Sequence, residues 1–480
     1  MSYGRGLSVL AERDPGRIAL VHEDETVTRD ALERGANRLA REFEARGVGL
    51  GDLVTIALPN SVAFVETAFA IWKLGAVPQP ISSHLPEAER AALIDLAKPA
   101  LVVGVDEGRY PGRPSIPAGF EASNERSDAP LPDRVSPERQ ALASGGSTGR
   151  PKLIIDVLPA EFDPEEGFYA VNPGQIALVP GPMYHAGPFL NGLLSILAGG
   201  AAIVMSRFDP ARSLELIDRH GVQFVNFVPT MLQRIWRLPG AERERFHLTS
   251  LERVVSSGAA CPVWLKLAWM DWIGDARFVE AYGASERIGG TMITGSELRL
   301  RPDSVGKPTA GREIRILDES GALLPPGEVG EVYMRPPGGQ GSTYRYVGAE
   351  SRATEDGWES IGDMGHLDEE GFLYLADRRS DMIVTGGANV YPAEVESAID
   401  AHDSVHSSVV IGLPHDDLGQ AIHAIVEARP KIVADVLREH LAARLVRYKI
   451  PSTFEFVDEP LRDDAGKVRR SKLRAERVDS

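Results

Sequence analysis

The densest cluster of chemically capable side chains in this sequence lies between Ser144 and Lys152. The segment reads Ser144-Gly145-Gly146-Ser147-Thr148-Gly149-Arg150-Pro151-Lys152. Its glycines let the backbone turn tightly and bring N–H groups close to an anion. Its hydroxyls can donate to phosphate oxygens, and Lys152 adds a positive charge. We therefore expect a phosphate-binding loop, although the Gly-Lys-Ser/Thr ending of the P-loop nucleotide motif is absent.

The same segment permits two other interpretations. Gly145 to Gly149 matches Gly-x-Ser-x-Gly, the nucleophile turn of α/β-hydrolases, which needs a strand before it and a helix after it. Here a β-branched run, Leu153–Leu158, follows Pro151 and predicts a second strand, so the context of the hydrolase turn is missing. A glycine- and serine-rich loop without any ligand stays open on this segment alone.

The elements that must position this loop follow an α/β pattern. Short β-rich runs alternate with helix-period segments, which predicts βαβ units with parallel strands. The strand candidates are Leu53–Leu58, Ala76–Ile81, Leu101–Val105, Ile176–Val179, Ala201–Met205, Phe224–Phe227, Val254–Ser257 and Arg277–Tyr282. The helix candidates are a segment opening at Asp30, Val62–Leu74, Glu87–Ala97, Arg212–His220, Thr230–Trp236 and Pro262–Ile273.

The pattern changes twice toward the C-terminus. From Glu313 to Met334 short β segments separated by turn residues predict a smaller β-rich subdomain. A boundary is expected near Arg378 to Asp381, and the residues beyond it alternate helices and strands. We predict a large N-terminal domain over 1–378, built of two βαβ-type sheets plus the β-rich part, and a small mobile α+β domain over 379–480. Such a pair builds a cleft that opens and closes.

Composition excludes several classes of protein. The chain has 52 Lys and Arg residues and 69 Asp and Glu residues, which gives a net charge of −17. This negative charge argues against binding to the phosphate backbone of a nucleic acid. The single cysteine, Cys261, cannot form an intrachain disulfide and favours a cytoplasmic location. The longest apolar stretch, Leu193–Met205, is interrupted by Ser and Gly and too short for a membrane span.

Further motifs follow the Ser144 loop in a fixed order along the chain. They are Tyr282–Glu286, Ser360–Asp363, Asp377–Ile383, Gly386–Glu396 and Ala465–Arg470. In order and approximate spacing the set resembles the core motifs of the adenylate-forming superfamily, which includes acyl-CoA synthetases, carrier-protein adenylation domains and luciferases. The resemblance covers essentially the whole chain.

The resemblance implies two half-reactions that use ATP, Mg²⁺ and CoA. A carboxylate attacks the α-phosphorus of ATP, and a thiol then displaces AMP from the acyl-adenylate. Joining two anions needs cations and oriented dipoles. The segment from Ser144 to Gly149, with Lys152, would hold the β- and γ-phosphates. The other implied ATP contacts are Glu286 on Mg²⁺, Ser285 on the α-phosphate, Asp363 and Arg378 on the ribose, and Gly258, Ala259, Ala281, Tyr282 and Gly283 around adenine.

The resemblance also assigns roles in the small domain. Lys467 would be the catalytic lysine that bridges the substrate carboxylate and the α-phosphate, although by composition alone it belongs to a solvated basic loop. The domain would then rotate about a hinge at Ser380, where the family usually has Asp or Lys. That rotation would bring Gly386 and Gly387 to the CoA tunnel.

The acid would bind in a pocket around the segment Pro182–Gly187. The residues implied for the acyl pocket are Tyr184, His185, Phe189, Phe227, Val228, Gly258, Ile288 and Gly289. No Asp is present to pair a substrate ammonium, so we expect an acid without an amino group. His185 is either a gate between acyl pocket and thiol tunnel or a packed interior histidine.

The size of the acid is inferred from small residues. The glycines expected to leave volume are Gly187, Gly192, Gly258, Gly289 and Gly290. Together with a likeness to the bile-acid and steroid-acid CoA ligase branch, they favour a bulky terpenoid- or steroid-like acid.

Because no carrier-protein segment follows Ser480, we expect a free-standing CoA ligase. The alternative is a stand-alone enzyme that loads a carrier protein. An ATP-binding module without turnover is a different class, in which removal of Lys467 would change little.

Overall fold

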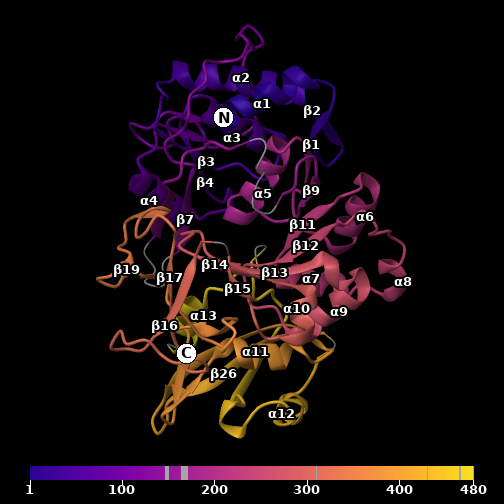
Figure 1. Cartoon of the computed structure of the whole chain (residues 1–480), viewed down its shortest axis with the longest axis vertical. Coiled ribbons are helices and arrows are strands. Elements are labelled where there is room, and N and C mark those ends of the chain that lie inside the picture. Colours follow the sequence, from indigo (N-terminus) through magenta and orange to yellow (C-terminus); the bar gives the residue numbers. More distant parts are fainter. Residues whose placement is uncertain (146–150, 164–170, 310, 430, 464–465, 479–480) are drawn as a thin grey trace.

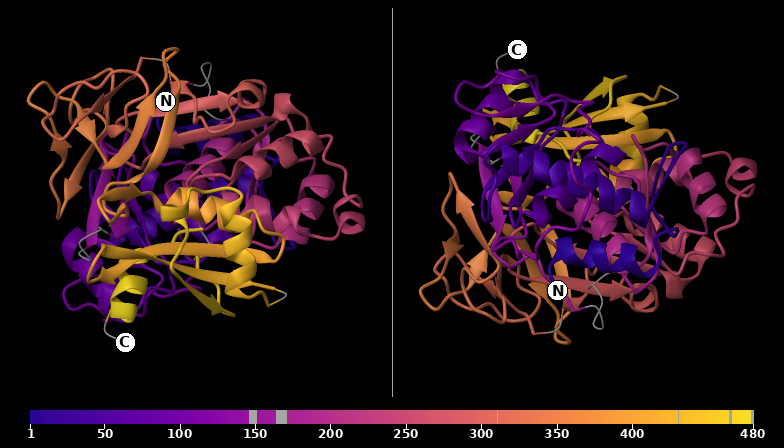
Figure 2. Two further views of the ribbon diagram at one scale, coloured as in Figure 1. Left: turned by 90° about the horizontal axis from the view of Figure 1, so that it is seen from below. Right: turned by 90° about the horizontal axis from the view of Figure 1, so that it is seen from above.

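The protein consists of a large N-terminal domain and a small C-terminal domain, coloured from indigo to orange and in yellow in Figure 1. The computed structural model describes residues 1–145, 151–163, 171–309, 311–429, 431–463 and 466–478. Seen from below, the yellow C-terminal elements lie in front, with the orange β-rich part on one side and the magenta helices on the other (Figure 2).

A nine-stranded sheet forms the centre of the large domain, in the order β15-β14-β13-β12-β11-β9-β10-β1-β2. Its strands are β1 Ile18–His22, β2 Glu25–Thr28, β9 Ile176–Val179, β10 Ala201–Val204, β11 Phe224–Phe227, β12 Arg253–Ser256, β13 Phe278–Gly283, β14 Gly290–Thr294 and β15 Lys307–Pro308. The strands from β13 to β1 are parallel, and the edge strands β14, β15 and β2 pair antiparallel. Parallel strands put their carboxyl ends on one edge, where open α/β sheets bind ligands.

The helices of this part follow the strands. They are α5 Ala186–Leu197, α6 Pro210–His220, α7 Pro229–Trp236, α8 Gly240–Arg243, α9 Val263–Ile273 and α10 Gly295–Leu300. The N-cap of α6 is Asp209, whose carboxylate accepts from the Arg212 N–H, and Gly221 at φ +59 ends the helix.

A second, parallel sheet has the order β4-β3-β5-β6. Its strands are β3 Leu53–Ile56, β4 Val77–Pro80, β5 Leu101–Val103 and β6 Ser115–Ile116. The associated helices are α1 Tyr3–Arg13, α2 Arg29–Ala45, α3 Val62–Lys73 and α4 Glu87–Ala97. Strands β7 Gln140–Gly145, β8 Pro151–Asp156 and β18 Tyr344–Val347 form a separate antiparallel sheet, β18-β8-β7.

The β-rich part is a six-stranded sheet. Its strands are β16 Glu313–Leu317, β17 Gly330–Arg335, β19 Arg352–Ala353, β20 Glu359–Ser360, β21 Asp363–Leu367 and β22 Leu373–Arg378. The chain leaves it after Arg378 and enters a five-stranded sheet made of β23 Ile383–Thr385, β24 Ala388–Val390, β25 Val405–His415, β26 Gly419–Ala428 and β27 Thr453–Val457. The C-terminal helices are α11 Pro392–Asp400, α12 Ala434–Ala442 and α13 Arg470–Val478.

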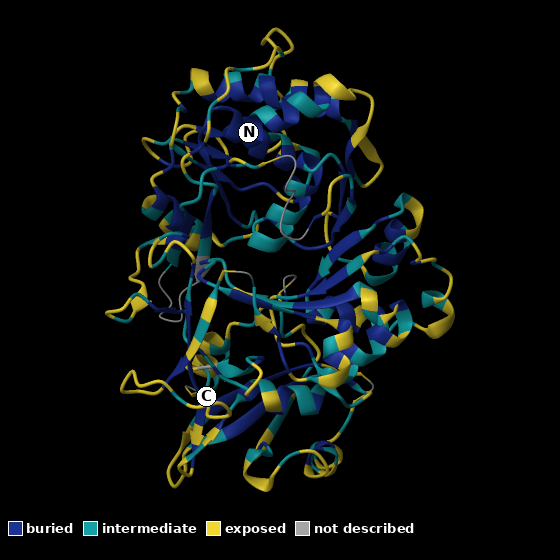
Figure 3. Cartoon of the chain, in the orientation of Figure 1, coloured by how far each residue is buried: buried dark blue, intermediate teal, exposed yellow. Residues whose placement is uncertain are grey.

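The predicted α/β class is confirmed, and most predicted elements agree with the structure to within two or three residues. Sequence analysis missed α1, β1 and α5. It also placed the basic residues after Lys467 in a loop, which is wrong from Arg470 onward because α13 begins there. Most residues of the central strands are buried, and they are coloured dark blue in Figure 3. In the described part of the chain we find no helix with the length and apolar character to cross a membrane.

Candidate functional site

A large cleft separates the two domains, and side chains from both line it. His185 reaches it from the start of α5 and Lys467 from the loop before α13. The Lys467 Nζ lies 3.4 Å from the His185 Nδ1, although the two residues are 282 positions apart in the chain. The small domain is therefore closed over the cleft with its lysine inserted.

A tight turn presents Lys467. The Asp463 N–H donates to the Lys467 carbonyl at 2.9 Å, and the Lys467 N–H donates to the Asp463 carboxylate at 2.8 Å. Gly466 adopts φ +73, which favours glycine. The turn rests on the large domain, because a Cβ on Gly466 would lie 2.8 Å from the Thr230 Oγ1. Outside the turn, Arg469 makes a bidentate ion pair with Glu89 at 3.0 and 3.2 Å, across the two domains.

His185 is neutral in this arrangement. Desolvation, followed by the nearby charge of Lys467, lowers the pKa of His185 to about 3. Its Nε2 is buried and has no hydrogen-bond partner among the described residues. A neutral ring accepts the approach of the ammonium group, whereas an imidazolium would repel it.

The expected phosphate loop joins two strands. Residues Gln140–Gly145 form β7 and residues Pro151–Asp156 form β8, and the two strands pair antiparallel with Ser144 opposite Lys152. The strand–loop–strand context excludes the hydrolase turn, as the sequence indicated. Of the predicted phosphate contacts, Gly146, Ser147, Thr148 and Gly149 lie outside the described residues.

Lys152 points from β8 toward a carboxylate and a tyrosine. Its Nζ lies 3.6 Å from the Glu286 Oε1 and 3.9 Å from the centre of the Tyr346 ring. The Tyr346 hydroxyl donates to the same Oε1 at 2.6 Å. Burial, followed by the charge of Glu286, raises the pKa of Tyr346, which keeps the phenol protonated as a donor. The loop lysine and the predicted metal ligand are thus neighbours on the cleft wall.

The turn that carries Ser285 and Glu286 is pinned to β8. Arg287 has φ +57, an uncommon backbone conformation for a side chain with a Cβ. Its guanidinium donates to the buried Asp156 carboxylate at 2.9 Å, and Arg139 approaches that carboxylate at 3.7 Å. This ion pair fixes the direction in which Glu286 leaves the turn.

Tyr282 and Asp363 meet at the end of β13. The Tyr282 hydroxyl donates to the Asp363 Oδ2 at 2.6 Å, which orients a carboxylate that is itself nearly buried. The lining of the cleft also includes the predicted nucleotide contacts Gly258, Ala259, Ala281, Gly283 and Ser285. Arg378 ends β22, opposite Asp363 in the register. The structure therefore brings Tyr282 and Asp363 into contact, and their role in binding a nucleotide stays a prediction.

The predicted acyl pocket needs a correction. Tyr184, His185, Val228, Gly258 and Gly289 line the cleft. Phe189, Phe227 and Ile288 do not line it, and all three are buried in hydrophobic cores.

The reason is the direction of each side chain. Phe189 lies on the inner face of α5 and packs against Phe64 and Trp72, at ring-centre distances of 6.1 and 5.7 Å. Phe227 points to the opposite face of β11 from Asn226 and packs against Trp269. The cleft side of α5 instead carries Leu190, Asn191 and Leu194.

Three of the five glycines expected to leave volume are packing contacts instead. A Cβ on Gly192 would lie 2.9 Å from Val179, one on Gly289 would lie 2.5 Å from the Met334 sulfur, and one on Gly290 would lie 2.7 Å from the Tyr282 carbonyl. Only Gly187 and Gly258 leave ordinary contact distances, 3.4 Å each. The number of glycines in this region therefore does not indicate that the acid is large.

The hinge and tunnel residues lie outside the centre of the site. Ser380 sits in an exposed turn between β22 and β23 and borders the cleft. Gly386 and Gly387 form the exposed turn of the β23–β24 hairpin, at φ +56 and +82, and are not among the described residues that line the cleft. Their predicted role in a CoA tunnel stays a prediction, since it belongs to a rotated arrangement.

Sequence reasoning missed Tyr346, Arg287, Asp156 and Asn226. Arg287 directly follows a recognised motif, but Tyr346 and Asn226 lie in ordinary β-type runs where nothing marks them.

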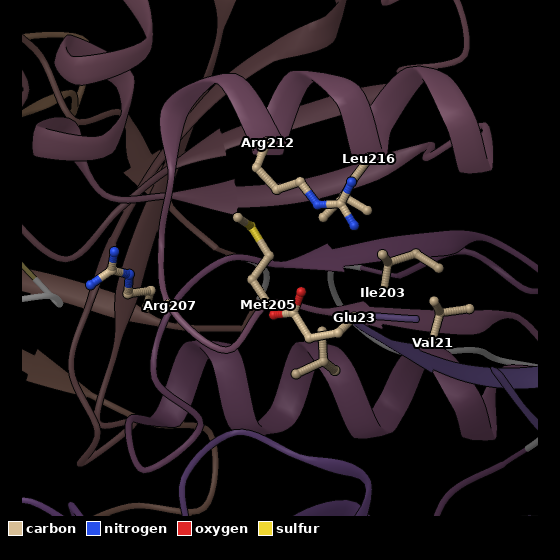
Figure 4. A pocket seen from close by; sticks show the side chains of 8 residues that line it. Val21, Glu23, Ile203, Met205, Arg207, Arg212 and Leu216 are labelled. Carbon is tan, nitrogen blue, oxygen red and sulfur yellow. The ribbon is translucent and has the colours of Figure 1, made fainter. Parts of the chain in front are cut away.

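A second, small pocket between β1, β10 and α6 shares no lining residue with the cleft (Figure 4). There the Glu23 carboxylate accepts from the Ser206 hydroxyl at 2.6 Å, and Arg212 pairs with Glu215. Within the described residues, no cluster of three or more potential metal ligands occurs.

The chain matches two family descriptions. "AMP-binding enzyme" covers residues 7–344 and "AMP-binding enzyme C-terminal domain" covers residues 394–467. A feruloyl-CoA synthase of an Amycolatopsis species is 31% identical over 490 residues, which span 97% of this chain and 96% of that protein. The fatty acid–[acyl-carrier-protein] ligase ScoC of Streptomyces coeruleorubidus is 29% identical, over 97% of this chain and 94% of that one.

Solved structures agree with these matches. The o-succinylbenzoate CoA synthetase of Bacillus subtilis, in complex with its acyl-adenylate intermediate, superposes with a TM-score of 0.81. The two sequences are 26% identical, and the match covers 98% of this chain and 97% of the other. The likeness extends through both domains.

Proposed function

This chain belongs to the family of AMP-binding enzymes, and from that premise we propose that it is an AMP-forming acid–CoA ligase. It activates a carboxylic acid with ATP and transfers the acyl group to the thiol of CoA. The observation that carries the proposal is the insertion of Lys467 beside His185 into the cleft that Lys152 and Glu286 also line. A module that only bound ATP would have no use for a lysine delivered by a second domain.

In the first half-reaction a carboxylate oxygen of the acid attacks the α-phosphorus. The bond from that phosphorus to the bridging oxygen breaks, and pyrophosphate leaves. In the second, the CoA sulfur attacks the acyl carbon, its proton is lost to solvent or base, and AMP leaves with the electrons of the broken carbon–oxygen bond. We assign Lys467 to the charge that develops in the first step, and Tyr282 with Asp363 to holding the nucleoside.

Glu286 suits a magnesium ion that is bound mainly by ATP. Mg²⁺ usually takes one or two protein carboxylates and completes its shell with phosphate oxygens and water. Glu286 offers one carboxylate, fixed by Tyr346, and Lys152 beside it can hold a phosphate oxygen. The ion would neutralise phosphate charge there.

We propose an aryl or arylalkenoic acid without an amino group as substrate. Support comes from the feruloyl-CoA synthase relative and from an apolar lining that includes Pro188, Leu190, Leu194 and Val228. The sequence favoured a terpenoid- or steroid-like acid because of its glycines, but Gly192, Gly289 and Gly290 make packing contacts and do not open space for a bulky acid. A carrier-protein thiol is the second candidate acceptor, favoured by the likeness to ScoC.

The proposal includes the division of the chain at residues 378 and 379, with Ser380 as the hinge. Support comes from β22, which ends the β-rich sheet at Arg378, and from β23, which begins a different sheet at Ile383. The turn between them is where a rotation could take place.

The test is release of AMP and pyrophosphate with ATP, Mg²⁺ and a panel of aryl, arylalkenoic, fatty and polycyclic acids, each with and without CoA or a phosphopantetheinylated carrier protein. Lys467→Ala should bind ATP but lose adenylation by at least about 100-fold, the range of one transition-state contact. Lys431→Ala, an exposed lysine of the same domain outside the cleft lining, is the control. The proposal would be contradicted if no acid caused release of AMP and pyrophosphate, or if Lys467→Ala kept full activity.

A further inference from the structure

Asn226 places a polar group in the apolar part of the cleft. It lies on β11, where Phe224 and Asn226 share the cleft face while Val225 and Phe227 point into the core behind the strand. The alternation follows from the two-residue period of a strand. Asn226 is partly exposed and lines the cleft, so a bound acid can reach its amide.

A hydrogen bond from the neighbouring strand orients this amide. The Ser257 hydroxyl, at the end of the neighbouring strand β12, donates to the Asn226 Oδ1 at 2.9 Å. The oxygen end of the amide is thereby occupied, and the NH₂ end is turned toward the first turn of α5. A Cβ on Gly187 would lie 3.4 Å from the Asn226 Nδ2. The missing side chain at Gly187 leaves the NH₂ group accessible.

The NH₂ group has no hydrogen-bond acceptor among the described residues. Its neighbours along the cleft wall, Pro188, Leu190 and Val228, offer apolar surface. A donor that loses water on ligand binding without gaining an acceptor weakens binding, whereas a matched acceptor in the ligand recovers the hydrogen bond.

We propose that Asn226 is a specificity-determining residue that donates a hydrogen bond to an oxygen substituent on the acid, a ring hydroxyl, methoxy or carbonyl oxygen. Ser257 is its positioning residue, because it holds the amide with the donor end toward the substrate. The enzyme accordingly prefers oxygenated aryl acids to the matching hydrocarbons. This inference rests on the proposed function and narrows its substrate class.

The test compares 4-hydroxycinnamate with cinnamate, using kcat/KM for pyrophosphate release. For the intact enzyme we expect a preference on the order of 10- to 100-fold for the hydroxylated acid, as for one buried hydrogen bond. Asn226→Leu keeps the volume and removes the donor, so the ratio of the two kcat/KM values should fall to about 1. An unchanged ratio in Asn226→Leu would overturn the inference.

Ser257→Ala is the second variant, and it keeps Asn226 itself. Without the Ser257 hydroxyl the Asn226 amide can rotate, so the preference for 4-hydroxycinnamate over cinnamate should shrink severalfold. The change should lie mainly in the KM for 4-hydroxycinnamate. Retention of the full preference in Ser257→Ala would overturn the positioning role.

The outcomes separate the two proposals. An intact enzyme that adenylates both cinnamates equally, or adenylates only acids of another class, contradicts the role of Asn226 and leaves the ligase function standing. Failure to adenylate any acid in the panel contradicts the ligase function itself.

Discussion

Replacement of Gly466 by alanine should separate the two half-reactions. In the closed arrangement the added Cβ would lie 2.8 Å from the Thr230 Oγ1 and 3.3 Å from the Val228 Cγ2, both in the large domain. Overpacking of this kind costs about 1–3 kcal/mol, which lowers the equilibrium constant for closure by about 5- to 150-fold. The positive φ of Gly466 adds strain of about 1–2 kcal/mol, but that strain is present in the open and closed forms alike.

The control for the backbone strain is Gly419→Ala. Gly419 has the same φ of +73 and lies in the same small domain, but the nearest atom to its added Cβ, the Val384 carbonyl oxygen, is 3.9 Å away. ATP–pyrophosphate exchange measures adenylation, and CoA transfer from a chemically prepared acyl-adenylate measures the second step. We expect Gly466→Ala to lose exchange by about 5- to 150-fold while its transfer rate stays within about twofold.

A second substitution locates the clash. Thr230→Ala removes the hydroxyl that the new Cβ would meet. The double variant Thr230→Ala/Gly466→Ala should therefore exchange pyrophosphate nearly as well as Thr230→Ala alone, so that the substitution at Gly466 costs much less activity in this background than in the wild type. The reasoning would be refuted if Gly466→Ala and Gly419→Ala exchanged pyrophosphate equally well.

Three other predictions follow from the same structure. Desolvation, followed by the charge of Lys467, lowers the pKa of His185 to about 3. The stability that the neutral His185 ring gives the closed form is therefore lost as pH falls from about 6.5 toward 3. Histidine NMR should show a neutral ring above pH 5 and a higher pKa in Lys467→Ala; an unchanged pKa would contradict the contact. Burial raises the pKa of Glu66 to about 7, so its carboxylate destabilises the fold as pH rises from about 4.5 through 7. Glu66→Gln should unfold like the wild type at pH 4 but be more stable at pH 8 by up to about 3 kcal/mol, and equal melting curves at pH 8 would refute this. Ser380→Pro, in the exposed turn between the domains, should keep pyrophosphate exchange and slow CoA transfer at least about 10-fold, whereas equal loss of both steps would argue against a hinge.

The sequence by itself determined the order of the elements and the motifs. The run of β-branched residues after Pro151 correctly predicted a strand, and that strand excluded a hydrolase. Local patterns carry this information because a strand, a helix and a glycine turn each depend on neighbouring residues. The same patterns put Lys152, Glu286 and Asp363 on elements that meet at the cleft.

Tertiary structure decided which face of each element the substrate meets. Phe227 and Asn226 are adjacent on a strand that is covered on both sides, so its sequence does not tell the core face from the cleft face. A glycine likewise either opens a pocket or admits a neighbour, and at Gly289 the neighbour is Met334. The meeting of Lys467 with His185 depends on how two domains dock, and no local pattern in either domain encodes that distance.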